Sequence, residues 1–299
     1  MAAESLAVAP AGAIRGERVH SAVWLDYWAL TKPEVNLLIV ITTAAAFCMA
    51  RPRAFASLPL SHLLYTLAGT LLVASGAATL NQWMERPFDA RMRRTARRPV
   101  ASGRVPPAQA LVFGVLLSLA GICELLLTVG SLPTFLALGT LASYLFLYTP
   151  LKRVSPLCTL IGAVPGAIPP LIGWTATGAP LDGDAWRLWA ILFLWQLPHF
   201  MAIAWMYRDD YERAGYFVLP RGVKRNRFVT LQTLLPLMGL ILATVHFGAA
   251  ALFLDLAFLC FGVRFVFRAS AASARQLLLA SIVYLPALLA LGVVFRFLG

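Results

Sequence analysis

Charged side chains are scarce in this sequence, and its cysteines are few and scattered. Of the 299 residues, 13% are charged and 60% are hydrophobic, and the mean hydropathy is +0.77. A soluble domain carries about twice that share of charge and does not bury so much apolar surface, so an ordinary soluble enzyme is excluded. No CxxC pair occurs, which excludes a disulfide framework and a cysteine zinc site, and the cysteines stand singly in apolar runs: Cys48, Cys123, Cys158 and Cys260.

Apolar runs of membrane-spanning length fill most of the chain instead. A helix needs about 20 apolar residues to cross a bilayer. The sequence therefore predicts an all-α, polytopic membrane protein. Residues 1–30 are expected to form a cytoplasmic N-terminal tail, with a short interfacial segment at 24–30, and residues 31–299 one membrane domain. We expect nine spans, at about 33–50, 60–82, 108–129, 132–150, 156–174, 186–206, 229–246, 248–266 and 276–297.

Basic residues are distributed very unevenly between the two sides of this predicted bundle. One side collects 21 of the 25 lysines and arginines, and the other has only Arg51, Arg53, Arg187 and Arg296. Because cytoplasmic loops are the basic ones, the N-terminus is predicted to be cytoplasmic and the C-terminus to lie outside. The net charge of +12 thus reflects topology in a lipid bilayer and does not indicate a nucleic-acid partner.

An acidic motif ends the second span. Asn81, Glu85 and Asp89 are four residues apart, so a helix carries all three on one face. Oxygen ligands of this kind suit Mg²⁺, although pairing of both acids with neighbouring arginines at a solvated helix end fits the spacing equally well. Pro87 has no N–H for the carbonyl of Trp83, which predicts a helix that kinks or ends near Glu85.

A second acidic cluster follows the sixth span, with Asp209 and Asp210 beside Arg208. Two such clusters that face the same compartment suit a Mg²⁺–diphosphate, in which carboxylates hold the metal and arginines neutralise phosphate charge. Tyr148 and Lys152 end the fourth span on the same side, where an interfacial anchoring role is the simpler interpretation.

Together these motifs resemble the intramembrane aromatic (UbiA-type) prenyltransferase superfamily. The resemblance rests on N-x-x-x-E-x-x-x-D at 81–89, R-T-x-x-R-P at 94–99, Y-x-x-x-K at 148–152 and the acidic second loop. The segments T-P-L-K-R at 149–153 and W-Q-L-P-H-F at 195–200 are similar to the haem-farnesylating branch of that family. The resemblance implies a nine-helix bundle with a central cavity under a cytoplasmic cap. It also implies Mg²⁺-dependent transfer of a farnesyl group from farnesyl diphosphate to a vinyl carbon of haem B, which yields haem O.

The resemblance also implies roles for individual residues. Metal ligands would be Asn81, Glu85, Asp89, Asp209 and Asp210, and catalysis would depend on Glu85, Asp89, Lys152 and Asp210. Diphosphate contacts would come from Arg94, Arg98, Tyr148, Lys152 and Arg208. Glu85 departs from the aspartate usual in the family. His199 stands near the place of an acid in quinone-type members, which predicts an acceptor-side role; the alternative is a histidine hydrogen-bonded to a neighbouring helix carbonyl.

Other functions fit the sequence less well. A prenyltransferase for a quinone or chlorophyllide precursor is the nearest alternative, and Pro198-His199-Phe200 speaks against it. A transporter would show mid-span charges and an inverted repeat, and a structural membrane protein would not need the two acidic motifs. The resemblance implies location in the cell inner (cytoplasmic) membrane, or alternatively the mitochondrial inner membrane. Haem A synthase and oxidase assembly proteins are then candidate partners.

Overall fold

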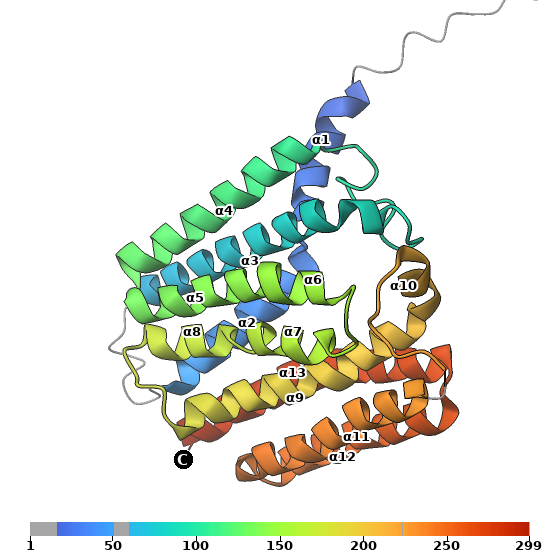
Figure 1. The fold of residues 1–299 in the computed structure, drawn as a ribbon. Helices are drawn as coiled ribbons and strands as arrows, with labels where there is room; N and C mark the ends of the chain where they lie inside the picture. The colour runs from blue at the N-terminus through green and yellow to red at the C-terminus, as the bar shows by residue number, and fades with distance from the viewer. Residues whose placement is uncertain (1–16, 51–59, 223, 299) are drawn as a thin grey trace, which may run out of the picture.

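The computed structural model describes residues 17–50, 60–222 and 224–298, and these ranges contain helices and connecting turns but no strand (Figure 1). In chain order the elements are α1 (Glu17–Leu30), α2 (Pro33–Ala50), α3 (Leu60–Asp89), α4 (Pro107–Thr128), α5 (Ser131–Ser143), η2 (Tyr144–Tyr148), α6 (Thr149–Leu151), α7 (Cys158–Gly166), α8 (Pro169–Ala176), α9 (Gly183–Met206), α10 (Arg208–Ala214), α11 (Lys224–Thr244), η3 (Val245–Phe247), α12 (Ala249–Arg268) and α13 (Ala271–Leu298).

The predicted membrane spans are confirmed. Within the described residues, nine helical segments are long and apolar enough to cross a bilayer. Each of them overlaps one predicted span, and three are assembled from pieces: the fourth from α5, η2 and α6, the fifth from α7 and α8, and the seventh from α11 and η3. The chain is therefore an all-α, multi-pass membrane protein.

A helix that kinks or ends near Glu85 is expected from Pro87, and the second of these alternatives is wrong, because α3 continues through Pro87 to Asp89. Proline leaves the carbonyl four residues earlier without its helical donor. Here that carbonyl, of Trp83, accepts a hydrogen bond of 2.7 Å from the guanidinium of Arg86. A neighbouring side chain thus supplies the missing donor. The helix continues for one more turn, and Asp89 lies on the same face as Asn81 and Glu85.

Residues 17–30 were predicted to be part of the tail, but they form helix α1, which contains the expected interfacial segment at 24–30. This helix is fastened to the loop after α3, because Arg104 forms a salt bridge of 2.9 Å with Asp26. Leu30 packs with Val100 and Val105 of the same loop in a small buried cluster. The remainder of the predicted tail, residues 1–16, lies outside the described residues.

The bundle turns its apolar side chains outward and many of its polar ones inward. Large exposed hydrophobic residues cover α4, α11 and α12, as expected of surfaces that face lipid, and include Leu116, Leu127, Leu242 and Phe253. Helices α3 and α4 approach closely through glycines: a Cβ on Gly121 would lie 2.7 Å from the backbone oxygen of Gly69. A cavity of about 310 Å³ remains between α2, α3, α5, η2, α7, α8, α9 and α13.

Three connections lie together at one end of the bundle, on the right in Figure 1: the loop 90–106 after α3, the turn between α6 and α7, and helix α10. Hydrogen bonds join them, since the backbone N–H of Arg94 donates to Asp210 and that of Phe217 donates to the carbonyl of Lys152. The α8–α9 connection and the C-terminal end of α13 lie at the opposite end (Figure 1). Both acidic motifs are therefore on one side.

This arrangement predicts the outcome of cysteine labelling. In a chain whose four native cysteines are replaced by alanine, cysteines at Arg97 and Lys224 should react with an impermeant reagent from the same face of the membrane. A cysteine at Asp182 should react only from the other face. Labelling of Arg97 and Lys224 from opposite faces would contradict the arrangement.

Candidate active site

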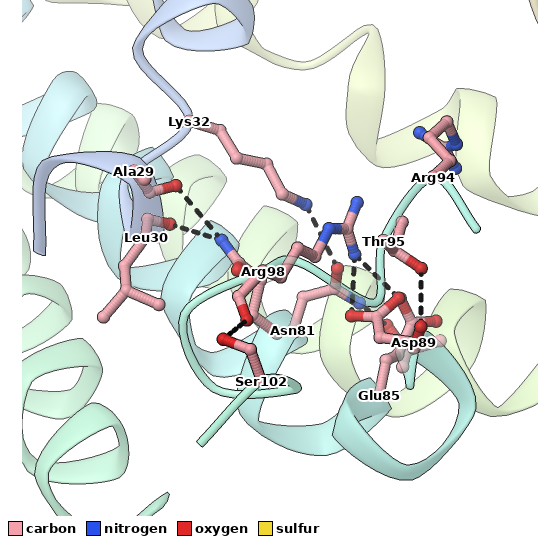
Figure 2. A network of polar contacts seen from close by, with 12 residues as sticks. Ala29, Leu30, Lys32, Asn81, Glu85, Asp89, Arg94, Thr95, Arg98 and Ser102 are labelled. Atoms are coloured by element: carbon pink, nitrogen blue, oxygen red, sulfur yellow. Dashed lines mark hydrogen bonds and ion pairs between the residues drawn. The ribbon is translucent and has the colours of Figure 1, made fainter. Parts of the chain in front are cut away.

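The acidic motif of α3 forms one buried face, as its spacing predicted. Asn81, Glu85 and Asp89 are 1%, 4% and 1% exposed, and they point into the same polar network (Figure 2). Burial of two carboxylates in a membrane protein is costly unless each is paired. Their partners therefore determine how the site is built.

Each member of this face has a cationic partner from a different part of the chain. Lys32 donates to the side-chain oxygen of Asn81 at 3.3 Å, and Lys152 donates to Glu85 at 2.8 Å. Arg98 donates through one nitrogen to both oxygens of Asp89, at 2.9 and 2.8 Å. The pairing with basic residues considered from the sequence thus occurs, but in a buried cluster and with a lysine from the α6–α7 turn as well as an arginine.

Lys32 is a site residue that belongs to no motif. In the sequence it is only one of the 21 basic residues on the predicted cytoplasmic side. It joins α1 to α2 with φ of +51°, a left-handed conformation that is unfavourable for a residue with a side chain. Burial, together with the positive charges of Arg98 and Lys152, lowers the pKa of Lys32 to about 7. Its ammonium group therefore lies where an additional anion would stabilise it. A lysine directly before a proline that begins the first span was the available signal.

Lys152 ends the Y-x-x-x-K motif and lies against its tyrosine. Its ammonium lies 4.5 Å from the ring centroid of Tyr148, and Gly162 leaves the space that this ring occupies. Burial alone would lower the pKa of Lys152, but the adjacent Glu85 carboxylate outweighs it and holds that pKa well above the usual value. The ammonium is therefore charged at neutral pH. Thr149, which begins the T-P-L-K-R segment and had no role assigned from the sequence, accepts a hydrogen bond of 3.2 Å from the Asn81 amide.

The second acidic motif is only partly brought to this cluster. Asp210 accepts hydrogen bonds from the backbone of Arg94 at 3.4 Å and from Arg213 at 2.8 Å. The adjacent Thr95 donates to the carbonyl of Asp89, so that the loop 90–106 links both motifs. Asp209 instead points outward, with its side chain 77% exposed and paired to Arg208 at 3.4 Å.

The donor set fits a magnesium ion that arrives with phosphate. Within residues 17–50, 60–222 and 224–298, no three acidic, histidine or cysteine side chains converge on one point. Mg²⁺ is, however, bound through one or two carboxylates, with phosphate oxygens and water completing its shell. Glu85 and Asp89 supply two carboxylates, and Asn81 adds an amide oxygen on the same face.

An apolar cavity opens directly beside the polar cluster. Its lining includes Lys32 and Tyr148 at the polar end, and Tyr144, Gln196, His199 and Phe200 further along. Lys32 belongs to both regions because it bonds to Asn81 and lines the cavity. The arrangement can thus hold a ligand with an anionic head and an apolar body.

His199 lies in the wall of this cavity with a defined orientation. Its Nδ1 is 2.8 Å from the hydroxyl of Ser281 on α13, and its ring packs on Trp195 at 5.0 Å between centroids. The Ser281 hydroxyl already donates to the carbonyl of Leu278 at 2.6 Å. We therefore assign the proton to Nδ1, which leaves Nε2 with a free lone pair. The expected alternative partner, a helix carbonyl, is replaced by a hydroxyl.

The geometry can be compared with known proteins. The model of the UbiA prenyltransferase family matches residues 39–284. The chain belongs to the UbiA prenyltransferase family. The family assignment made from the motifs is thereby confirmed. The chain is also 44% identical over 278 residues to the protoheme IX farnesyltransferase of Solibacter usitatus (strain Ellin6076), a match that covers 87% of this chain and 95% of that protein.

Solved structures share the fold. A digeranylgeranylglyceryl phosphate synthase structure superposes with a TM-score of 0.72 at 15% identity and covers 92% of this chain and 99% of its own. A UbiA homologue from Archaeoglobus fulgidus, bound to GPP and Mg²⁺, gives a TM-score of 0.64 at 12% identity over 91% of this chain and 99% of its own. At these identities the likeness establishes the arrangement of helices alone.

Proposed function

We propose that this UbiA-family prenyltransferase transfers a farnesyl group from farnesyl diphosphate to a vinyl carbon of haem B and so makes haem O. One observation carries the proposal: the buried polar cluster is continuous with an apolar cavity. The two regions meet at Lys32, which bonds to Asn81 and also lines the cavity. The 44% identity to a protoheme IX farnesyltransferase supports haem B as the acceptor. The archaeal structure bound to GPP and Mg²⁺ supports a magnesium diphosphate as the donor.

The residues of α3 would hold the metal, and the basic residues around them the diphosphate. Asn81, Glu85 and Asp89 face the same space. Asp210 on α10 accepts a hydrogen bond from the backbone of Arg94 in the loop that follows them. Lys32, Arg94, Arg98 and Lys152 supply positive charge there, and Tyr148 supports Lys152. Arg208 and Asp209 lie at the outer edge and would act only after a rotation of their side chains. Bound Mg²⁺ would supply further neutralisation of the phosphate charge.

The reaction begins when the allylic C–O bond breaks and its electron pair leaves with the diphosphate. Lysine and arginine side chains stabilise the charge that develops on the leaving oxygens. The vinyl group of haem B then attacks the farnesyl cation, and water adds to the resulting porphyrin-side cation with loss of a proton. The apolar cavity excludes water from the farnesyl cation until the carbon–carbon bond has formed.

His199 would act on the acceptor. With its proton on Nδ1, a neutral imidazole presents Nε2 as a ligand for haem iron. Ser281 is then a positioning residue, because it fixes the tautomer and the ring orientation.

We further propose that the end carrying both acidic motifs faces the cytoplasm of a bacterial cell, in the inner membrane. The excess of basic residues in the connections at that end supports this orientation. Labelling of Arg97→Cys in intact cells from outside would contradict it.

The donor and metal assignments predict a graded response to α3 variants. Asp89→Asn, which keeps the size of the side chain but removes its charge, should lower haem O formation about 100-fold, as loss of a transition-state ligand does. Glu85→Asp should keep partial activity because only the reach changes. Glu124→Ala, which removes a carboxylate that belongs to α4, is the control, and its haem O formation should equal that of the wild type. The measurement is haem O by mass after incubation of purified protein with haem B, farnesyl diphosphate and Mg²⁺.

The absence of haem O from the wild-type reaction under these conditions would overturn the proposed function. Full activity of Asp89→Asn across Mg²⁺ concentrations would overturn the metal assignment alone.

The acceptor assignment predicts a selective loss at His199. His199→Ala should weaken haem B binding, measured by titration of the Soret band, while binding of farnesyl thiodiphosphate stays unchanged. Ser281→Ala should weaken haem binding less, by about 10-fold, as loss of an orienting partner does. His62→Ala is the matched control, because this histidine bonds to the carbonyl of Ala176 outside the cavity lining. Unchanged haem affinity in His199→Ala would leave His199 as a packing residue.

A further inference from the structure

The hydroxyl of Tyr216 is a buried donor without an acceptor beside the polar cluster. The residue is 3% exposed, and its hydroxyl makes no hydrogen bond to any residue that the structure describes. Buried polar groups are nearly always paired, and an unpaired one costs free energy. A hydroxyl of this kind beside a proposed substrate site indicates that the substrate supplies the missing acceptor.

The position of Tyr216 is held from both sides of the chain. Gly215 ends α10 in the left-handed conformation with φ of +83°, which turns the chain back toward the cluster. Phe217, the residue after Tyr216, donates its backbone N–H to the carbonyl of Lys152 at 2.7 Å. The tyrosine ring itself packs on Phe88, with 5.4 Å between ring centroids. These contacts restrict the orientation of the Tyr216 side chain, so its hydroxyl stays beside the polar cluster.

The charges that act on the Tyr216 phenol are those of the proposed diphosphate site. Burial raises its pKa well above the usual range, and the Glu85 carboxylate raises it further, through its negative charge and through its nearness to the phenol hydroxyl as an acceptor, while Lys152 opposes this. The hydroxyl nevertheless does not reach hydrogen-bonding geometry with Glu85 or with any other described residue. The phenol therefore stays protonated and is a neutral donor. Glu85 has Lys152 as its partner at 2.8 Å, and Asp89 has Arg98, so both nearby carboxylates are already neutralised.

We propose that Tyr216 binds the leaving group, by donating a hydrogen bond from its hydroxyl to a phosphate oxygen of the allylic diphosphate. This inference rests on the proposed function for the identity of the substrate. No proton is transferred: the hydrogen stays on the tyrosine oxygen while the phosphate oxygen accepts. The bond strengthens as the C–O bond breaks and negative charge accumulates on the diphosphate, so that Tyr216 contributes more to turnover than to binding.

The test is Tyr216→Phe, which removes only the hydroxyl and keeps the ring contacts. Its affinity for farnesyl thiodiphosphate with Mg²⁺, measured by calorimetry, should fall about 10-fold, as expected for a hydrogen bond to a charged group. The kcat for haem O formation should fall by more than that factor. Affinity for haem B should stay unchanged, because His199 lines the cavity and Tyr216 does not. Tyr27→Phe is the matched control, since its hydroxyl donates to Gln109 at the exposed side of α1.

Stability separates this role from a structural one. Because the hydroxyl is unpaired, its removal should leave the ligand-free unfolding temperature of Tyr216→Phe unchanged or raise it. Equal thiodiphosphate affinity in Tyr216→Phe and wild type would overturn the inference, as would a lowered unfolding temperature together with weaker haem binding. A wild-type protein that binds no thiodiphosphate would overturn the proposed function instead.

Discussion

Two carboxylates are buried at the end of a membrane helix, and the architecture around them follows from the need to neutralise their charge. An unpaired charge in such surroundings costs several kcal/mol. Glu85 and Asp89 obtain their partners from the α6–α7 turn and from the loop 90–106, while Lys32 at the start of α2 reaches Asn81 on the same face. These ion pairs and hydrogen bonds bring separate connections together at one end of the bundle. The position of the loops is therefore a consequence of the charges on α3.

The same cluster is suited to a charged substrate because its donors outnumber its acceptors. Lys32 has one weak bond to an amide oxygen, and Tyr216 has none among the described residues. A magnesium diphosphate brings phosphate oxygens for the donors and a cation for the carboxylates, so each internal ion pair can be exchanged without leaving a charge alone. The adjoining cavity is mostly apolar and accepts the remainder of the substrate. Charge at the mouth and an apolar interior are what a prenyl diphosphate requires.

The sequence predicted those features that depend on local periodicity. The spans followed from apolar runs, and the shared face of Asn81, Glu85 and Asp89 followed from four-residue spacing on a helix. Features that depend on individual side-chain contacts, whether local or between distant segments, were missed. Pro87 did not end α3, because a guanidinium satisfied the freed carbonyl. Lys32, Tyr216 and Ser281 carry no motif, and their importance appears only when the fold places them beside α3 or His199.

The central claim is that the carboxylates of α3 are already neutralised in the free protein and change partners only when diphosphate arrives with the metal. The most direct measurement is the thermal unfolding temperature of the purified protein in detergent, with Mg²⁺ and farnesyl thiodiphosphate added separately and together. The account predicts little shift with Mg²⁺ alone and a much larger shift with both, because each ligand completes the site for the other. Full stabilisation by Mg²⁺ alone, or by the thiodiphosphate without Mg²⁺, would contradict it.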